Sequence, residues 1–259
     1  MNTSPTDVAP ESAAPGADCT VCAHAADLLP AGRCQPGDAC IVAHSGRQID
    51  RFLRRNRDQA ERHLDDAFWE RRAIAATYAP VEAVAPLRRD PDEVVRRVVA
   101  SRLRGDALLD MLKDPDREVR VTVAARLPEA QLALLMHDPD YSVRVEVARR
   151  LPHGKLMAMG HDPDREVRKA VARRLPPFAL GLMLADEDAE VRRIVAERAL
   201  PELAERLLAD PDWRVRFEAA GKAPPPALDA LFDDPEPPVR ELARSRCPHA
   251  PERSIEDAT

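Results

Sequence analysis

The sequence predicts an all-α protein built as a solenoid, in which one short helical unit repeats along most of the chain. Three observations predict this class. A pattern of the form DPDxxVRxxVAxRLP returns every 24 residues from Asp90 onward. Aromatic residues make up only 3% of the chain while Ala, Leu, Val and Arg are abundant, which favours helices over sheets. No segment shows the alternation of apolar and polar residues that is typical of a strand.

Residues 1–18 precede the first cysteine and are rich in Pro, Ala and Ser. They lack the basic start and the apolar run of a secretory signal, so we expect a flexible tail on a cytoplasmic protein. No apolar run along the chain approaches the roughly 18 residues that a membrane span requires, so we expect no membrane association. In the reducing cytoplasm, clustered cysteines indicate metal binding or redox chemistry more often than structural disulfides.

Residues 19–44 contain four of the five cysteines, in the stretch CTVCAHAADLLPAGRCQPGDAC. The spacing C-x2-C-x11-C-x5-C offers four thiolates to one metal centre. By itself it fits a [4Fe–4S] cluster and a tetrahedral zinc ion equally well, and a disulfide or redox pair less well. His24 and His44 are possible substitute ligands, although four cysteines suffice. The candidate ligands are Cys19, Cys22, Cys34 and Cys40.

Residues 45–65 are expected to form helices that connect the cysteine module to the repeats. Ser45 is a suitable N-cap, and Ile49, Phe52 and Leu53 fall on one face of the helix that follows. A terminal repeat has no neighbour to cover it. We therefore expect the cysteine module and these helices to seal the N-terminal end of the repeat stack.

Residues 66–259 contain eight copies of the 24-residue repeat. The first copy begins at Asp66 and departs from the pattern at Phe68 and Arg71, as is usual for a terminal repeat. In the other seven copies an aspartate column recurs without a gap, at Asp90, Asp114, Asp138, Asp162, Asp186, Asp210 and Asp234.

Each copy is expected to fold as one α-helix of about three turns followed by a short 3-10 helix. The column aspartate is suited to the N-cap and the proline after it to the first helical position. Apolar residues at offsets +5, +9, +10 and +13 form one face, as in Val119, Val123, Ala124 and Leu127. A proline at +14 stops the helix in five copies. One copy cannot bury its apolar face alone, so the copies are expected to stack in two layers.

Two columns of basic residues accompany the helices, at offsets +6 and +12. The +6 column could form a basic stripe for phosphate or nucleic acid. However, an aspartate recurs beside every arginine and the chain carries a formal net charge of −6, so nucleic-acid binding is disfavoured. We expect a structural ladder in which each arginine pairs with the aspartate of its own or the next repeat. The +12 residues lie in the last helical turn, where the helix dipole favours positive charge.

The fifth cysteine and two histidines of the repeats are expected to be structural or surface residues and not parts of a site. Cys247 falls on the +13 column that leucines occupy elsewhere, so we expect a small core residue. His137 and His161 precede repeat aspartates and are expected at the surface. The chain contains no Gly-rich phosphate loop, no HExxH and no GxSxG, so we expect a protein that is not an enzyme.

The 24-residue DPDxxVRxxVAxRLP repeat and the preceding CTVCAHAADLLPAGRCQPGDAC segment together closely resemble the bacterial leucine-rich repeat variant family. The resemblance covers nearly the whole chain after residue 18. It implies alternating α- and 3-10 helices in a right-handed superhelix, and a [4Fe–4S] cluster on the four cysteines of residues 19–44. HEAT-like repeats differ because they are longer and pair two α-helices.

The expected function is that of a non-enzymatic iron–sulfur protein whose solenoid surface binds a protein partner. The cluster would be structural, redox-active or a sensor of oxygen or iron. Two alternatives stay open at this point: a zinc-capped interaction scaffold, and a HEAT-like nucleic-acid-binding protein or enzyme that uses the arginine columns.

Overall fold

The computed structural model describes residues 18–247, and in this range it is helical with one isolated β-bridge between Gln35 and Ala39. The predicted all-α class is therefore confirmed. The predicted tail, apart from Asp18, and the end of the eighth copy lie outside the described residues. No helix in the described part of the chain is long and apolar enough to cross a membrane. The chain divides into two compact units, residues 1–126 and 127–259.

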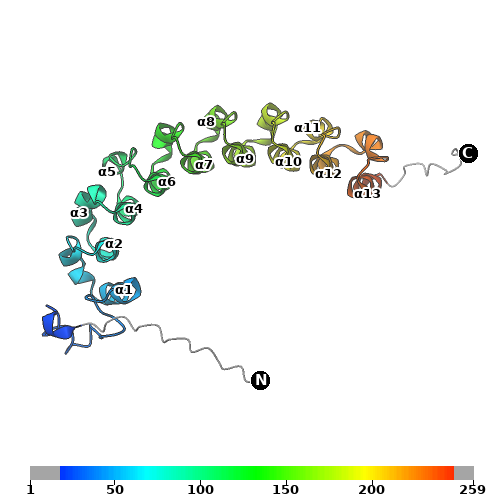
Figure 1. Ribbon diagram of the computed structural model, residues 1–259. Coiled ribbons are helices and arrows are strands. Elements are labelled where there is room, and N and C mark those ends of the chain that lie inside the picture. The colour runs from blue at the N-terminus through cyan, green and yellow to red at the C-terminus, as the bar shows by residue number, and fades with distance from the viewer. Residues whose placement is uncertain (1–17, 248–259) are drawn as a thin grey trace, which may run out of the picture. The chain divides into compact units, whose positions relative to one another are not determined.

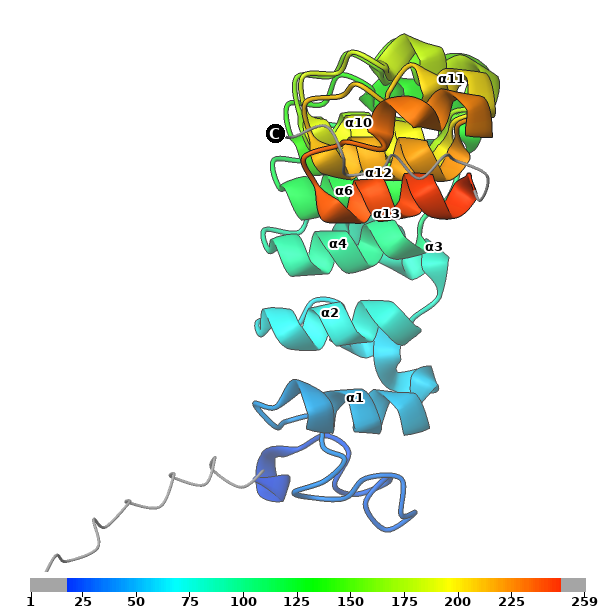
Figure 2. The same cartoon turned by 90° about the vertical axis from the view of Figure 1, so that its right-hand side faces the viewer.

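The first unit contains the cysteine module and the first repeats. Its long helices form one layer and its short helices another, and α1, α2 and α4 run alongside one another (Figures 1 and 2). Its elements are η1 (Cys19–Val21), α1 (Gly46–Arg55), η2 (Arg57–His63), α2 (Trp69–Tyr78), α3 (Val81–Val84), η3 (Ala85–Arg89), α4 (Glu93–Arg102), α5 (Asp106–Leu109) and α6 (Arg117–Arg126).

The second unit contains the later repeats and has the same two layers (Figure 1). Each long helix spans ten residues and contacts the next long helix. Its elements are η4 (Glu129–Leu135), α7 (Tyr141–Arg150), α8 (His153–Leu156), η5 (Met157–Met159), α9 (Arg165–Arg174), η6 (Pro177–Met183), α10 (Ala189–Arg198), α11 (Pro201–Glu205), α12 (Trp213–Lys222), η7 (Pro225–Leu231) and α13 (Pro237–Arg246).

The predicted apolar columns form the core between neighbouring repeats. In the copy that starts at Asp162, Val167, Val171, Ala172 and Leu175 are at most 1% exposed. Each fully buried Val or Leu contributes about 1.5–3 kcal/mol, so the stack and not the single copy is the stable unit. The short helices add their own apolar residues to this core, such as Leu180 and Met183 on η6.

The predicted short 3-10 helices are confirmed, with a refinement. Segments η4, η6 and η7 are 3-10 helices of seven residues each. In four other copies the short segment begins with a single α-helical turn instead, at α3, α5, α8 and α11. The fourteen residues between two long helices, such as those between Arg174 and Ala189, leave room for either form.

The predicted N-cap position is wrong by two residues. In the copy that starts at Asp162, the cap of α9 is Asp164, whose side chain accepts the backbone N–H of Glu166. Asp162 instead accepts the backbone N–H of Asp164 at 2.9 Å, which folds the DPD turn ahead of the helix. The same arrangement caps four further helices through Asp92, Asp140, Asp188 and Asp212.

The +6 arginines form the predicted ladder, with the aspartate of the next repeat. Arg144 donates from Nε and Nη2 to the two carboxylate oxygens of Asp162, at 2.8 and 2.9 Å. Its Nη1 donates to the backbone carbonyls of Asp138 and Pro139 in its own DPD turn. The same two-bond pairing recurs in both units, in Arg72–Asp90, Arg96–Asp114, Arg168–Asp186, Arg192–Asp210 and Arg216–Asp234.

The +12 basic residues have a role that the helix dipole alone does not predict. Arg174 donates from Nη1 to the carbonyls of Ala148 and Leu151, at 3.0 and 2.6 Å. These carbonyls lie at the C-terminal end of the preceding long helix, where backbone acceptors lack intrahelical partners. The arginine of one repeat therefore caps the helix of the repeat before it. Arg102, Arg150, Arg198 and Arg246 make equivalent contacts.

Candidate metal centre

The backbone of residues 19–44 is irregular and turns back on itself at two glycines. Gly32 and Gly37 have φ angles of 68° and 83°, which only glycine adopts without strain. On either side of Gly37, Gln35 and Ala39 exchange two backbone hydrogen bonds of 2.9 and 2.8 Å. This pairing closes a tight turn, so Cys34 and Cys40, which flank it, emerge beside each other. The LLPAG and QPGD segments thus provide the turns of the module.

The four predicted ligands come from separate parts of this module, and the charges of the other three act on Cys34. Cys34 and Cys40 are buried, whereas Cys19 and Cys22 are half-buried. The pKa of the Cys34 thiol is raised to about 11, first by burial and then by the charges of Cys40, Cys22 and Cys19. A thiolate at Cys34 is therefore unfavourable unless a cation compensates it.

The thiols lie close enough for their charges to interact, yet they do not surround a common point. Within residues 18–247 no three Cys, His, Asp or Glu side chains are arranged to hold a metal ion. The assignment of all four cysteines as ligands therefore stays a prediction. The donor set itself fits an iron–sulfur cluster, because four thiols, two of them buried, are the ligands that such clusters take.

The two histidines considered as substitute ligands are engaged in aromatic contacts. The ring of His24 is buried and lies 5.3 Å from the ring of Phe52 and 5.8 Å from that of His63. His44 is exposed and its ring lies 5.7 Å from that of Phe68. Both histidines thus have packing partners.

The helix α1 joins the module to the repeats, as the apolar face of residues 45–65 predicted. Ile49, Phe52 and Leu53 are fully buried. The module attaches to the N-terminal turn of α1 through polar contacts, since Cys40 donates its backbone N–H to the carbonyl of Gln48 at 3.1 Å. The side chain of Gln48 in turn donates to the carbonyl of Gly37 at 2.6 Å. Ser45 occupies the predicted N-cap position but makes no side-chain capping bond.

Buried polar groups in this part of the first unit were not predicted from the sequence. Asn56 is fully buried and donates to the carbonyl of Arg33 in the module, at 2.8 Å. Among the described side chains, five buried polar atoms have no hydrogen-bond partner, and four of them lie here: Asn56 Oδ1, Gln59 Oε1, His63 Nε2 and Arg71 Nε. Burial, followed by the nearby His24, lowers the pKa of His63 to about 4. No sequence pattern predicts that polar residues of η2 are buried, because their burial depends on packing against residues far away in the chain.

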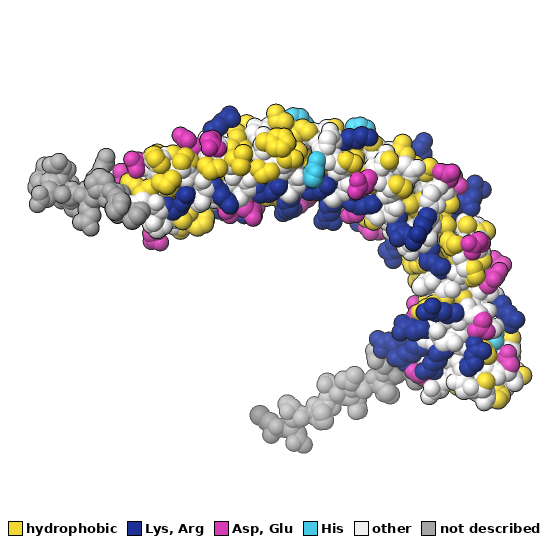
Figure 3. Space-filling view, turned by 180° about the vertical axis from the view of Figure 1, so that it is seen from behind, with side chains coloured by type: hydrophobic (Ala, Val, Ile, Leu, Met, Phe, Trp, Pro, Cys, Tyr) yellow, Lys and Arg dark blue, Asp and Glu magenta, His cyan; other side chains and the backbone are white. Residues whose placement is uncertain are grey.

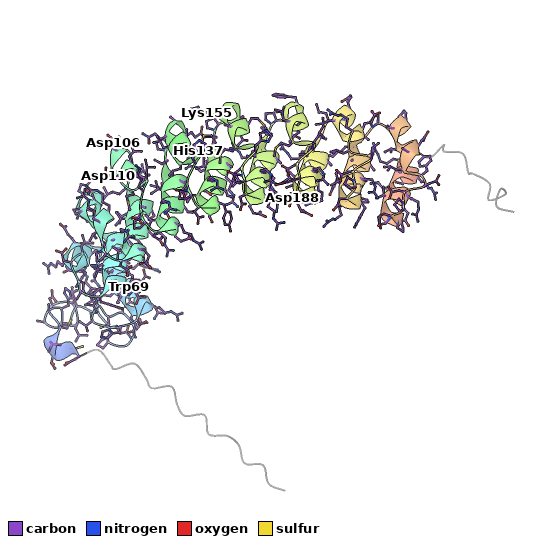
Figure 4. All side chains as sticks on the ribbon, turned by 45° about the horizontal axis from the view of Figure 1, so that its top comes forward. Trp69, Asp106, Asp110, His137, Lys155 and Asp188 are labelled. Carbon is purple, nitrogen blue, oxygen red and sulfur yellow. The ribbon has the colours of Figure 1, made fainter. Side chains whose placement is uncertain are left out.

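The other sequence candidates lie far along the chain from the module. His137 and His161 are exposed, as predicted, and His137 lies at the surface where η4 leads into α7 (Figure 4). Cys247 is half-buried and donates its thiol to the carbonyl of Pro225 at 3.2 Å, so it is not the core residue that its column predicted. It follows the last described helix, where no further described repeat covers it.

Comparison with known proteins supports both parts of this architecture. Residues 16–62 match the family described as LRV protein FeS4 cluster. Residues 117–140 and 165–188 match the family described as Leucine rich repeat variant. No curated protein matches the chain.

Solved structures give a closer relation. A structure described as a leucine-rich repeat variant with a novel repetitive protein structural motif is 53% identical, covers 90% of this chain and 99% of its own, and has a TM-score of 0.86. An engineered protein (16% identity, 80% and 85% coverage, TM-score 0.40) and a designed armadillo repeat protein (18%, 79% and 87%, TM-score 0.19) are too dissimilar to inform the site. With 53% identity across nine-tenths of its length, the chain belongs to the leucine-rich repeat variant family of iron–sulfur proteins.

Proposed function

We propose that Cys19, Cys22, Cys34 and Cys40 bind a [4Fe–4S] cluster in a non-enzymatic protein whose repeats form a scaffold for a protein partner. One observation carries the proposal: burial, and then the charges of three other cysteines, raise the pKa of the Cys34 thiol, in a segment that matches an iron–sulfur family. Four mutually repelling thiolates become favourable together when a metal centre neutralises them.

The unequal burial of the four cysteines supports a redox or sensing role. When bound, a [4Fe–4S] cluster supplies one-electron transfer, at a potential that depends on solvent exposure and hydrogen bonding. Cys34 and Cys40 are buried, whereas Cys19 and Cys22 are half-buried and flank Val21, whose side chain is 80% exposed. The Cys19–Cys22 side of the site is therefore the side that solvent, small molecules or a redox partner would reach.

The internal ion pairs of the +6 arginines support the scaffold role. The +6 guanidinium groups of the ladder are 7–12% exposed and paired within the protein, so they are committed to internal contacts rather than to phosphate groups. Large repeat surfaces commonly bind proteins. We place the protein in a reducing compartment such as the cytoplasm, where clustered cysteines bind metals more often than they form structural disulfides.

Metal and sulfide analysis of anaerobically purified protein tests the cluster. We expect about four iron and four sulfide per chain and a brown colour with broad absorption near ~400 nm. Cys34→Ser should lose this chromophore, whereas Cys247→Ser, a matched control outside the module, should retain it. A colourless protein with one zinc per chain and no sulfide would overturn the iron–sulfur assignment in favour of a zinc-capped scaffold.

A further inference from the structure

One surface of the first unit is strongly basic although the chain carries a net charge of −6. Arginines are gathered on the exposed side of α1 and just after it (Figure 3). We call these residues the α1 arginine surface: Arg47, Arg51, Arg54, Arg55 and Arg57. All five are exposed.

Only two carboxylates pair with these five arginines in the described structure. Asp38 pairs with Arg51 and with Arg55, and Asp50 pairs with Arg54 at 2.6 Å. Arg47 forms no ion pair with any described residue. The surface therefore retains an excess of positive charge, and the side chains of its three paired arginines remain 44–65% exposed.

Part of this surface is held in place by a tyrosine. Tyr78 donates its hydroxyl to Asp50 at 2.5 Å and accepts a bond from Arg54 Nε at 3.4 Å. The guanidinium carbon of Arg57 lies 5.6 Å from the centre of the same ring, at cation–π distance. Guanidinium groups fixed in this way lose less conformational entropy when they bind an anion.

The α1 arginine surface borders the candidate metal centre. Asp38, which pairs with Arg51 and Arg55, lies in the tight turn between Cys34 and Cys40. Gln48 on the same helix binds the backbone at Gly37 and Cys40. A partner seated on α1 would therefore contact the loop that carries two of the four cysteines.

We propose that the α1 arginine surface is the docking site of an acidic redox protein that exchanges electrons with the cluster, an inference that rests on the proposed [4Fe–4S] function. Complementary charge steers partners together and suits the small, transient interfaces of electron-transfer complexes. A carboxylate-rich patch on a globular protein matches a helix about 15 Å long. An extended nucleic acid would also meet the rest of the chain, whose net charge is negative.

Binding of two defined anionic probes tests the surface. Fluorescence anisotropy at low salt would compare a labelled polyglutamate peptide with a single-stranded DNA oligonucleotide of equal charge. We expect the peptide to bind, and Arg47→Gln combined with Arg55→Gln to weaken it by about tenfold. The matched control is Arg89→Gln combined with Arg104→Gln, two exposed arginines of the same unit without ion pairs to described residues, which should leave binding unchanged.

The redox part is tested on the iron–sulfur-loaded protein with small oxidants of opposite charge. Oxidation of the reduced cluster by anionic hexacyanoferrate(III) should slow several-fold in the Arg47→Gln/Arg55→Gln variant and with added salt. Oxidation by cationic hexaammineruthenium(III) should not slow. If the substitutions slowed oxidation by both reagents equally, or if neither reagent oxidised the cluster, electron exchange through the α1 arginine surface would be overturned.

Two further outcomes are decisive. Peptide binding that ignores the α1 substitutions, or tighter binding of DNA through the same arginines, would overturn the inference of an acidic protein partner. Failure of the proposed function is recognised separately, because a protein without iron and sulfide would show no chromophore whether or not the peptide binds α1.

Discussion

The cysteine module and the repeats are stabilised in opposite ways. Each repeat buries four apolar columns against its neighbours, with residues such as Val167, Val171 and Leu175 at most 1% exposed. In residues 18–44 the buried side chains are few and mostly small: Leu28, Cys34, Ala39, Cys40, Ile41, Ala43 and the polar His24. The repeats therefore derive stability from apolar burial, whereas the module has too little apolar surface to fold well on its own.

The two regions also differ in how well their buried polar and charged groups are paired. In the repeats, the six ladder arginines within the two units each have a carboxylate partner held by two hydrogen bonds. Of the five buried polar atoms without a partner among the described residues, four lie near the module, on Asn56, Gln59, His63 and Arg71, and one lies in the repeats, on Gln131. Unsatisfied buried polar atoms are rare in native proteins and costly. The N-terminal region is thus the part of the molecule whose stability depends most on what the cysteines bind.

The largest expected effect follows from removing the metal. A structural metal site contributes folding energy on the order of 10 kcal/mol, so residues 18–44 should lose their structure without it. Amide hydrogen exchange in peptides from this segment should accelerate at least about a hundredfold, while peptides from α9 and α12 stay protected. Mass spectrometry of the protein before and after anaerobic chelation measures both.

The Cys34→Ser variant is the control for chelator effects. It should exchange like the metal-free protein from the start and show no further change on chelation. Equal protection of residues 18–44 with and without metal would mean that the module folds independently, and the contrast with the repeats would disappear.

Breaking the ladder is expected to give the next largest effect. Arg144→Leu leaves the Asp162 carboxylate, 6% exposed, without its arginine partner. Removing one member of a buried ion pair costs about 3–5 kcal/mol. Chemical denaturation should show this loss in the second unit, and any affinity for DNA should stay unchanged.

Two variants sharpen this result. Arg149→Leu, on the same helix, removes an exposed arginine whose 3.6 Å pair with Glu146 is worth at most about 1 kcal/mol. The double variant Arg144→Leu/Asp162→Asn removes the stranded charge but keeps an acceptor for the Asp164 N–H, so it should recover part of the loss. An Arg144→Leu protein as stable as its parent would contradict a structural ladder.

A smaller effect is expected from the buried histidine near the module. Burial lowers the pKa of His63 from 6.5 to about 4, so the unfolded chain binds this proton more readily than the folded one. Above pH 6.5 His63 is neutral in both states and does not reduce the free energy of unfolding. As the pH falls towards about 4, this free energy drops by on the order of 2–3 kcal/mol. Direct titration of the His63 ring by NMR checks the pKa.

The matched control is the exposed His137. Replacing His63 with Phe should flatten the stability profile between about pH 4 and 6.5, whereas His137→Gln should leave it unchanged. A His63 ring that titrates near 6.5 in the folded protein would show that burial does not govern it.

The repeat architecture could be predicted from the sequence because each feature recurs. Seven aspartates and seven arginines at fixed offsets average out local ambiguity, and the apolar columns define one helical face. The 24-residue period itself leaves too little room for two full helices, which predicts the short 3-10 segments. The choice between the two aspartates of each DPD turn could not be made in this way, since both recur with the same period.

The site was predictable in part. The spacing of the four cysteines predicts a shared metal centre, and the apolar face of α1 predicts its packing. The burial of Asn56 and His63 and the pairing of Arg51 and Arg55 with Asp38 involve residues that occur once and lie far apart in the chain. Such contacts depend on the three-dimensional arrangement and leave no periodic signal.

The smallest expected effect separates the two aspartates of the DPD turn. Asp164 accepts the backbone N–H of Glu166 at 2.8 Å and so caps α9, whereas Asp162 is the ladder partner of Arg144. Replacing an N-cap by alanine costs about 1 kcal/mol, and serine restores most of it because its hydroxyl also caps. Asp164→Ala should therefore destabilise the protein by about 1 kcal/mol and Asp164→Ser by a few tenths.

Asp162→Ala should cost more, because it leaves the guanidinium of Arg144 without its carboxylate partner. Measured in the same denaturation series, this larger cost would show that the ladder contributes more stability than the cap. Equal costs at the two positions would contradict this division of roles.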